Sequence, residues 1–347
     1  MSADNSTSPS PPSSPQVGTE SGEPSPSSSL KRGITQARRY CALAVRYILP
    51  AWIVGQIFRD SVHLTALCFY IPSPLVAVLL LGKALRNIRK PRLALRPLFW
   101  MILPLLSTFL LDNHWDRRTI PTKGKETRRI VHWNIYGSNF GLKNILQTVD
   151  ESHPDLMVLS EVPKIIRDDR FHERYADGYS FLRIGNMVIV AKGELTNLDV
   201  TPLTHGMVGL VEWNDRDRKR LVLVADLPSS ILIARDPLLR QINGLIEQHH
   251  PDFIVGDLNA PRLSNQLQRL PSGYRHAYDA VGSGWSYTWP VRWPMHSTLR
   301  PVLESILLAP VLSLDHCIVG PDVKPLHYDL RTTRFSDHRL QLLEFEN

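Results

Sequence analysis

The chain carries two different hydrophobicity patterns, one on either side of residue 126. Between residues 41 and 111 three long apolar stretches follow one another, whereas beyond residue 127 short apolar runs alternate with polar segments. An apolar stretch of about 20 residues is long enough to cross a bilayer as a helix. Short apolar runs bounded by turn residues are typical of buried strands. The pattern therefore predicts a helical membrane region followed by a strand-rich domain.

The three apolar stretches cover residues 41–58, 61–81 and 93–111. Arg46 and Pro50 interrupt the first stretch, while the other two are long enough to span a bilayer. A helical hairpin buried in a soluble domain is the alternative interpretation. Because no amphipathic pattern accompanies these stretches, the sequence favours two or three transmembrane helices, with membrane lipids as partners.

Basic residues predict how these helices are oriented. They cluster before the first stretch and between the second and third, at Lys31, Arg32, Arg38, Arg39, Lys83, Arg86, Arg89, Lys90, Arg92 and Arg96. Short loops rich in Lys and Arg stay on the cytoplasmic side. We therefore expect a multi-pass membrane protein with a cytoplasmic N-terminus and an extracytoplasmic C-terminal domain. This orientation holds whether or not the first stretch spans.

Composition predicts three regions. Residues 1–30 are dominated by Ser, Pro, Gly and Thr without periodicity, so we expect a disordered tail and not a signal peptide. Residues 31–126 form the membrane region, with two or three transmembrane helices and basic loops. Residues 127–347 are numerous enough for one large domain.

The C-terminal domain is predicted to belong to the α/β class. Its strand-like runs cover residues 129–135, 156–161, 180–184, 187–191, 207–213, 221–226, 253–257, 316–319 and 340–345. Helices are expected over 140–151 and 235–249. Two mixed sheets packed face to face, with helices outside, accommodate this number of strands.

Polar residues with catalytic potential follow two of these runs. Asp257 and Asn259 come after the apolar run 253–255 and are two positions apart, so their side chains point to one face of a strand. A carboxylate beside an amide can take a proton from water and hold the resulting nucleophile. Glu161 stands at the end of another run, where open α/β sheets place their ligands. Hard oxygen ligands of this kind suit Mg²⁺ or Mn²⁺ and not zinc.

Each of these residues also has an ordinary interpretation. An Asp-x-Asn at a strand end is more often a turn or a cap than a catalyst, and an isolated Glu161 is more often a solvated surface charge. Five segments that occur together in one order are harder to explain in this way. They are His132-Trp133-Asn134-Ile135, Leu159-Ser160-Glu161-Val162, Gly256-Asp257-Leu258-Asn259, Leu314-Asp315-His316 and Ser336-Asp337-His338.

In this order and at these spacings, residues 127–347 resemble the endonuclease/exonuclease/phosphatase superfamily, whose members cleave phosphate esters with a divalent metal. The resemblance implies a four-layer α/β sandwich, here preceded by transmembrane helices. It also implies that Glu161 is the main carboxylate ligand of Mg²⁺ or Mn²⁺. Asn134 would bind or orient the metal shell beside it, and Asp337 would complete the metal environment.

The same resemblance implies catalytic roles. Asp257 would activate the attacking water, and Asn259 would hold the nucleophile and the scissile phosphate. His338 would donate to a non-bridging oxygen or support the leaving group. Asp315 would bond the far nitrogen of that imidazole, which fixes its tautomer and favours its charged form.

Two further positions are expected to border the substrate. Thr288 lies in an aromatic loop over residues 285–290 that looks like the family's substrate-bordering Tyr-Thr-Trp loop, although a packed aromatic loop is the alternative. Asp226 occupies the place where many relatives carry a histidine that contacts the phosphate. A carboxylate there repels phosphate unless it is protonated, binds a second metal or points away. Asp226 therefore either reduces the hydrolytic activity or meets one of these three conditions.

The distribution of charged residues along the chain bears on whether the protein binds DNA. The whole chain has a net charge of +7, but residues 1–129 carry a balance of +11 and residues 130–347 a balance of −4. The basicity belongs to the membrane region, so it does not predict a dedicated DNA-binding face. The three cysteines show neither a disulfide framework nor zinc-ligand spacing.

The sequence leaves three functions open. The first is a membrane-anchored, divalent-metal-dependent phosphoesterase that hydrolyses a phosphodiester or phosphomonoester by in-line water attack. The second is a catalytically impaired module that binds a phosphorylated ligand, and the third is a structural docking module. Nucleic acid, phospholipid head groups and small phosphate esters are all compatible substrates, and no protein partner can be inferred.

Overall fold

The computed structural model describes residues 46–115, 120–121, 124–139, 141–166, 169–175, 177–215, 218–291 and 309–347, together with the single residues 36 and 43. The chain separates into two units, residues 1–46 and 47–347. The predicted disordered tail and the start of the first apolar stretch lie outside the described residues. The second unit contains both the apolar helices and the strand-rich domain.

The second unit begins with helices. Residues 47–58 are helical, and α2 (His63–Phe69), α3 (Ser73–Arg86) and α4 (Pro91–Leu111) follow. Among the described residues, α4 is the one continuous helix that is long and apolar enough to cross a membrane, and it coincides with the third predicted stretch.

The second predicted stretch is not one continuous helix. Helices α2 and α3 are separated at residues 70–72 and are bent by 62° relative to one another. Pro72 has extended backbone angles immediately before α3. Proline disfavours helical geometry in the residue before it, so Ile71 cannot easily continue α2. The pair is therefore a second candidate span only if a broken helix crosses the bilayer.

The C-terminal part contains two mixed six-stranded sheets within the described residues. The first sheet has the order β13 (Pro325–Arg331), β14 (Leu340–Glu346), β2 (Thr127–Asn134), β3 (Leu156–Ser160), β5 (Met187–Lys192) and β4 (Tyr179–Ile184). The second has the order β10 (Arg275–His276), β12 (Asp315–Val319), β9 (Phe253–Asp257), β8 (Arg218–Asp226), β7 (Met207–Asp215) and β6 (Glu194–Pro202). Each sheet contains one parallel pair, β2–β3 and β8–β9 respectively, and its other described pairs are antiparallel.

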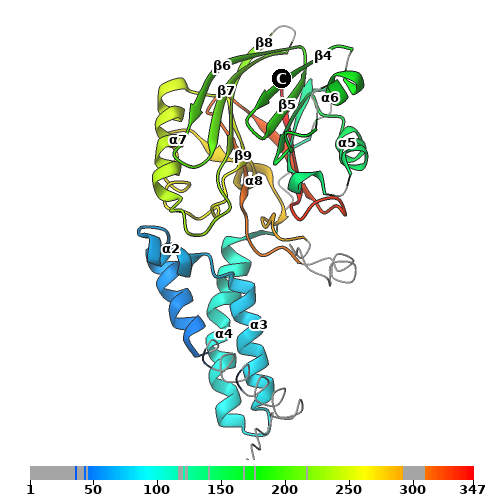
Figure 1. Ribbon diagram of the computed structural model, residues 1–347. Coiled ribbons are helices and arrows are strands. Elements are labelled where there is room, and N and C mark those ends of the chain that lie inside the picture. The colour runs from blue at the N-terminus through cyan, green and yellow to red at the C-terminus, as the bar shows by residue number, and fades with distance from the viewer. Residues whose placement is uncertain are drawn as a thin grey trace, which may run out of the picture. The chain divides into compact units, whose positions relative to one another are not determined.

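The two sheets pack face to face with helices outside, as Figure 1 shows. Apolar side chains of both sheets, such as Val158 and Val224, form a shared central cluster. A second cluster joins the first sheet to α5 (Leu142–Asp150) and α6 (Asp169–Arg174), and a third joins the second sheet to α7 (Asp236–His249). Three apolar layers thus separate four layers of secondary structure, which confirms the predicted α/β sandwich.

The nine predicted strands coincide with β2, β3, β4, β5, β7, β8, β9, β12 and β14, and the two predicted helices with α5 and α7. The sequence did not predict β6 or β13. β6 is an edge strand with mostly exposed positions, so it lacks the apolar run that marks a buried strand. The smaller elements are the 3₁₀ turn η1 (Tyr136–Ser138), α8 (Ala277–Val281) and the two-stranded ribbon of β1 (Asn113–His114) and β11 (Gly284–Trp285).

The sheet register gathers the predicted site residues at one edge of the sandwich, the edge formed by the carboxyl ends of the parallel strands. In the second sheet Asp226 pairs with Asp257, and Asp257 pairs with Asp315 on the antiparallel β12. In the first sheet Asn134 pairs with Ser160, so Glu161 follows directly at the same end. Both parallel pairs therefore present their carboxyl ends to one place.

Candidate active site

Asp257 stands at the centre of the site and is fully buried. The preceding Gly256 allows β9 to lie close to β8, because a Cβ at this position would come within 1.8 Å of the carbonyl oxygen of Ala225. Burial, followed by the charge of Asp315, raises the pKa of Asp257 well above its usual value. A carboxylate whose pKa is raised is a stronger base, which suits the predicted role of Asp257 in activating water.

The amide of Asn134 connects the two sheets. Its Nδ2 donates to Glu161 Oε1 at 3.0 Å and to Asp257 Oδ2 at 2.9 Å, while its Oδ1 accepts from the backbone N–H of Tyr136 at 2.9 Å. Glu161 has a φ of 57°, a left-handed conformation that is uncommon outside glycine and is often found at functional sites. Asn134 therefore orients two carboxylates, and its role toward a metal stays a prediction.

Asn259 adopts a similar left-handed conformation, with a φ of 47°. Its backbone N–H donates to Asp257 Oδ1 at 2.9 Å, and its Nδ2 donates to the carbonyl of Leu227 at 2.8 Å. Its own carbonyl accepts a hydrogen bond from the hydroxyl of Tyr70 at 3.0 Å. The residue is thus held beside Asp257 on three sides, which supports its predicted position at the nucleophile.

His338 forms an ion pair with Asp315. The distance from His338 Nδ1 to Asp315 Oδ2 is 2.8 Å, and both residues are buried. Burial alone lowers the pKa of His338, but the charge and hydrogen bond of Asp315, with the charges of Asp257 and Asp337, raise it to about 10. Burial likewise opposes the charged form of Asp315, yet His338 outweighs it and the pKa of Asp315 is lowered. At neutral pH His338 is therefore charged and can donate a proton, and its catalytic role stays a prediction.

Two buried residues, Thr288 and His132, lie next to Asp315. Thr288 Oγ1 accepts from the backbone N–H groups of Leu314 and Asp315 at 3.0 and 3.2 Å. Thr288 is only 1% exposed and its hydroxyl holds the backbone at Asp315, while its contact with substrate stays a prediction. His132 Nδ1 lies 3.8 Å from Asp315 Oδ1, and burial lowers the pKa of His132 to about 4.

Sequence reasoning did not assign His132 a role, although its place two residues before Asn134 on one strand was an available signal. It also missed Asn186, in the turn between β4 and β5. Asn186 Nδ2 donates to Asp226 Oδ2, and its carbonyl accepts from the backbone N–H of Val162. A Gly-Asn pair between two strands predicts only a hairpin turn, so the sequence held no signal for this contact.

Asp226 lies in the site. Its carboxylate is buried, is bonded to Asn186, and faces the charges of Glu161, Asp315 and His338. Burial, followed by the charge of Glu161, raises the pKa of Asp226 to about 7. Neutral and charged forms of Asp226 are therefore both accessible near neutral pH. Of the three conditions under which a carboxylate is tolerated here, pointing away does not apply, and protonation does in part.

The carboxylates of the site exceed its cations, which is the electrostatic condition for binding a metal. Ligand atoms of Asp257, Asp315 and His338 all lie within 4.8 Å of one another, and Glu161 joins the same network through Asn134. Because His338 is protonated and bonded to Asp315, we do not regard its imidazole as a ligand.

Asp337, the third predicted metal residue, accepts a hydrogen bond from Trp289 Nε1 at 3.1 Å through Oδ2. Its Oδ1 is buried without a hydrogen-bond partner among the described residues. An unsatisfied buried carboxylate oxygen is costly unless a cation or a proton neutralises it. The donor set, hard oxygens with excess negative charge, therefore fits a hard divalent cation.

Comparisons with known proteins agree with this arrangement. A model of the Endonuclease/Exonuclease/phosphatase family matches residues 131–338. No curated protein sequence matches the chain.

Several solved structures are similar in fold. Truncated TDP2 from Caenorhabditis elegans has 18% identity and a TM-score of 0.49, covering 64% of this chain and 98% of that chain. TDP2 from D. rerio, complexed with a single strand DNA product, has 16% identity and a TM-score of 0.48, covering 64% of this chain and 100% of that chain. A mannosyl-6-phosphatase from Bacteroides thetaiotaomicron has 13% identity and a TM-score of 0.44, covering 63% of this chain and 100% of that chain. With TM-scores under 0.5, these likenesses carry no argument about function.

Proposed function

Because the chain belongs to the endonuclease/exonuclease/phosphatase family, we propose that it is a membrane-anchored phosphoesterase that depends on a divalent metal, Mg²⁺ or Mn²⁺. The single observation that carries the hydrolytic part is the pairing of a base with an acid. Asp257, a carboxylate with a raised pKa, lies within 4.8 Å of His338, an imidazole with a pKa of about 10. Catalysts of ester hydrolysis need both groups at the reacting atoms.

The reaction follows from these two groups. Asp257 takes a proton from a water molecule while the water oxygen forms a bond to phosphorus. The bond between phosphorus and the opposite ester oxygen breaks, and His338 supplies a proton to the departing alcohol. Asp315 keeps the imidazole oriented and charged. Asn259, fixed by its bonds to Asp257 and Leu227, borders the nucleophile.

Glu161 and Asp337, with Asn134 beside Glu161, would hold the cation, which when bound neutralises charge on the phosphate and acidifies water. Asn134 also bonds Asp257, so it couples the carboxylate of one sheet to that of the other. Asp226 borders this cluster, and its pKa is raised to about 7.

Metal-dependent hydrolysis is tested on the full-length protein purified in detergent, with bis(p-nitrophenyl) phosphate as substrate. We expect turnover with Mg²⁺ or Mn²⁺, loss of turnover in excess chelator, and a loss of orders of magnitude in Glu161→Gln. Glu173→Gln, an exposed glutamate of α6, is the matched control and keeps full turnover. Equal activity with and without chelator would show that the metal is not required.

The membrane part of the proposal is supported by α4 and by the bent pair α2 and α3. We further propose that the N-terminus is cytoplasmic and that the catalytic domain is extracytoplasmic, because the basic loops flank the apolar stretches on one side. A reporter that is active on one side only, fused after Asn347, measures this orientation. A cytoplasmic signal would overturn it.

A catalytically impaired phospho-ligand-binding or docking module is the second candidate, and Asp226 is the observation that favours it. If this carboxylate blocks catalysis, the purified protein binds inorganic phosphate or a phosphodiester in the presence of metal but hydrolyses neither. Asp226→His would then restore a phosphate donor and raise turnover. Measurable turnover in the unaltered protein excludes this candidate.

A further inference from the structure

The segment that carries Asn259 is bonded to the loops between the N-terminal helices. Tyr70, at the break between α2 and α3, donates its hydroxyl to the carbonyl of Asn259 at 3.0 Å. Asp60 Oδ1 accepts from the backbone N–H of Asn265 at 2.7 Å, and Ser61 Oγ accepts from Asn265 Nδ2 at 3.0 Å. These loop residues lie at the ends of the apolar helices, where the proposed membrane region meets the sandwich.

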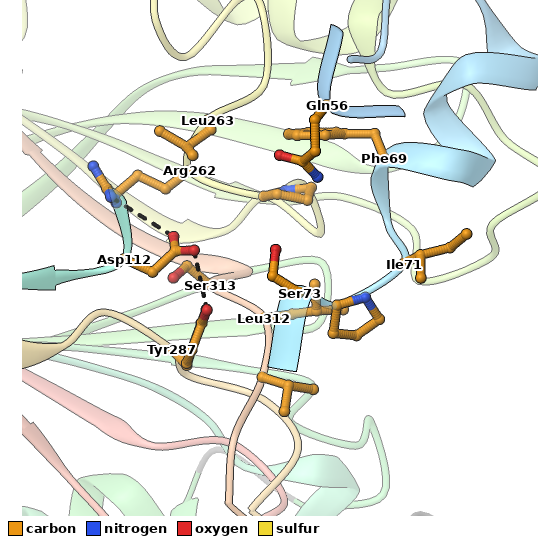
Figure 2. Close-up of a pocket in the computed structure, with 13 residues that line it drawn as sticks. Gln56, Phe69, Ile71, Ser73, Asp112, Arg262, Leu263, Tyr287, Leu312 and Ser313 are labelled. Carbon is orange, nitrogen blue, oxygen red and sulfur yellow. Dashed lines mark hydrogen bonds and ion pairs between the residues drawn. The ribbon is translucent and has the colours of Figure 1, made fainter. Parts of the chain in front are cut away.

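The end of α4 is bonded to the same segment. Arg262 donates to the carbonyl of Leu111, the last residue of α4, and pairs with Asp112 at 3.8 Å. Tyr287 also donates to Asp112, at 3.0 Å, and Figure 2 shows both contacts converging on this carboxylate. The cavity drawn there is lined by residues of both regions and adjoins the segment after Asn259, but it does not contain the catalytic side chains. The catalytic edge of the sandwich is therefore held at the ends of the helices.

Most exposed apolar side chains of the described sandwich lie in chain segments that carry site residues. Among the described residues from 127 onward, five large apolar side chains are exposed, and four of them lie in segments next to site residues. Ile165 (88% exposed) follows Glu161, Ile231 and Leu232 (61% and 79%) follow Asp226, and Trp285 (38%) precedes Thr288. We call these four residues the apolar rim. The fifth, Leu198, lies on the edge strand β6.

The apolar rim continues onto the helices. Trp285 packs against Phe109 of α4, with ring centroids 5.3 Å apart, and Phe109 stacks on Trp115 at 5.6 Å. Ile231 shares a surface hollow with residues of α2, including Leu67. Tryptophan is enriched where a membrane meets water, and contiguous exposed apolar surface marks an interaction site. Two residues of the rim, Trp285 and Ile231, thus adjoin the helices, and this apolar surface is suited to the bilayer.

We propose that the site hydrolyses the phosphodiester of a membrane lipid while the lipid stays in the bilayer. This inference rests on the proposed function and specifies its substrate class. The oxygen of water bonds to phosphorus, one of the two ester bonds of the lipid phosphodiester breaks, and the products are a phosphomonoester and an alcohol. The proton of water goes to Asp257, and the departing alcohol takes one from His338. A nucleic acid is less well matched, because residues 130–347 carry a net charge of −4 and the rim is apolar.

The test uses the full-length protein reconstituted in vesicles of equal parts phosphatidylcholine and phosphatidylglycerol. Lipid hydrolysis is followed by ³¹P NMR, and soluble turnover is followed on bis(p-nitrophenyl) phosphate and on a single-stranded oligonucleotide. The double variant Ile231→Ser, Leu232→Ser removes part of the rim without touching a catalytic group. Leu198→Ser is the matched control at an exposed apolar position away from the rim.

We expect the lipid to be hydrolysed faster than the oligonucleotide. The double rim variant should lose roughly a hundredfold or more in lipid hydrolysis, the order expected when two apolar side chains no longer enter the bilayer. Its turnover of the soluble diester and that of Leu198→Ser should remain unchanged. Hydrolysis of the soluble diester without lipid hydrolysis, faster cleavage of the oligonucleotide, or an equal loss in both variants would overturn the inference and leave the proposed function standing. No hydrolysis of any substrate would overturn both.

Discussion

Large apolar side chains take opposite places in the two parts of this protein. On the helices before residue 112 many of them point outward, with Phe99 65% and Leu110 68% exposed. In the sandwich after residue 127 most large apolar side chains are buried, and Trp133 and Trp213 are completely so. A side chain is buried away from water but has no reason to be buried away from lipid. The exposed apolar side chains of the helices therefore support the proposal that this part contacts lipid.

At the apolar rim the sandwich exposes large apolar side chains, as the helices do. Everywhere else in the described sandwich, exposed large apolar side chains are reduced to Leu198. Polar groups show the reverse contrast, because the sandwich buries several carboxylates and a charged imidazole at the same edge that carries the rim. Catalytic groups and apolar contacts thus share one edge.

The largest expected effect separates catalysis from membrane attachment. Asp257→Asn removes the general base, so turnover of a phosphodiester should fall about 10²–10⁴-fold. Retention of the protein in the membrane fraction should not change. The control is Asp322→Asn, an exposed aspartate in the turn between β12 and β13, which should keep its turnover. Comparable turnover in Asp257→Asn and the unaltered protein would show that another group activates the water.

The complementary substitution disturbs the membrane insertion of α4 and leaves the candidate active site unchanged. Leu103→Asp places a charge on an exposed position near the middle of α4, and such a charge in a spanning helix costs about 2.5–3.5 kcal/mol. We expect a large fall in the membrane-integrated fraction, measured by resistance to alkaline extraction. Leu198→Asp, the same change on the exposed β6, should have no such effect. Full integration of Leu103→Asp would contradict a lipid-facing α4.

Buried charge in the sandwich predicts a pH dependence of stability. The folded-state pKa of Asp226 is raised from 3.8 to about 7, so the folded protein binds this proton more tightly than the unfolded chain. The corresponding stability is present below about pH 4 and is lost as pH rises toward 7. In excess chelator, Asp226→Asn should flatten this decline and be more stable at pH 8 by about 2 kcal/mol. Identical pH profiles of thermal unfolding would show that Asp226 does not titrate in this way.

The smallest expected effect concerns Asn186. Its hydrogen bond to Asp226 is stronger when the carboxylate is charged, because bonds to charged groups contribute about 1.5–3 kcal/mol and neutral ones about 0.5–1.5. Asn186→Ala should therefore lower the free energy of unfolding by about 1 kcal/mol more at pH 8 than at pH 5. A loss independent of pH would indicate a purely structural role in the turn.

Much of the fold could be predicted because its signals are local. The nine apolar runs that became strands are each recognisable within a few residues, and the helices α5 and α7 show a local periodicity. β6 could not be predicted, because an edge strand with exposed positions has no apolar run. The sequence shows a proline at position 72, where a helix is expected to break. The 62° angle between α2 and α3 depends on how the two helices pack.

For the site, the sequence alone determined which residues end the strands: Asn134, Glu161, Asp226 and Asp257 each follow an apolar run. Only the tertiary structure decided what these side chains do there. It placed Asn134 between two carboxylates of different sheets, turned Asp226 toward Glu161, set Thr288 behind Asp315 and joined Tyr70 to Asn259. Hydrophobic periodicity records which face of a strand is buried, and this can be read within a short window. The partner of a polar side chain depends on how segments that are distant in the sequence pack, and no local pattern encodes that.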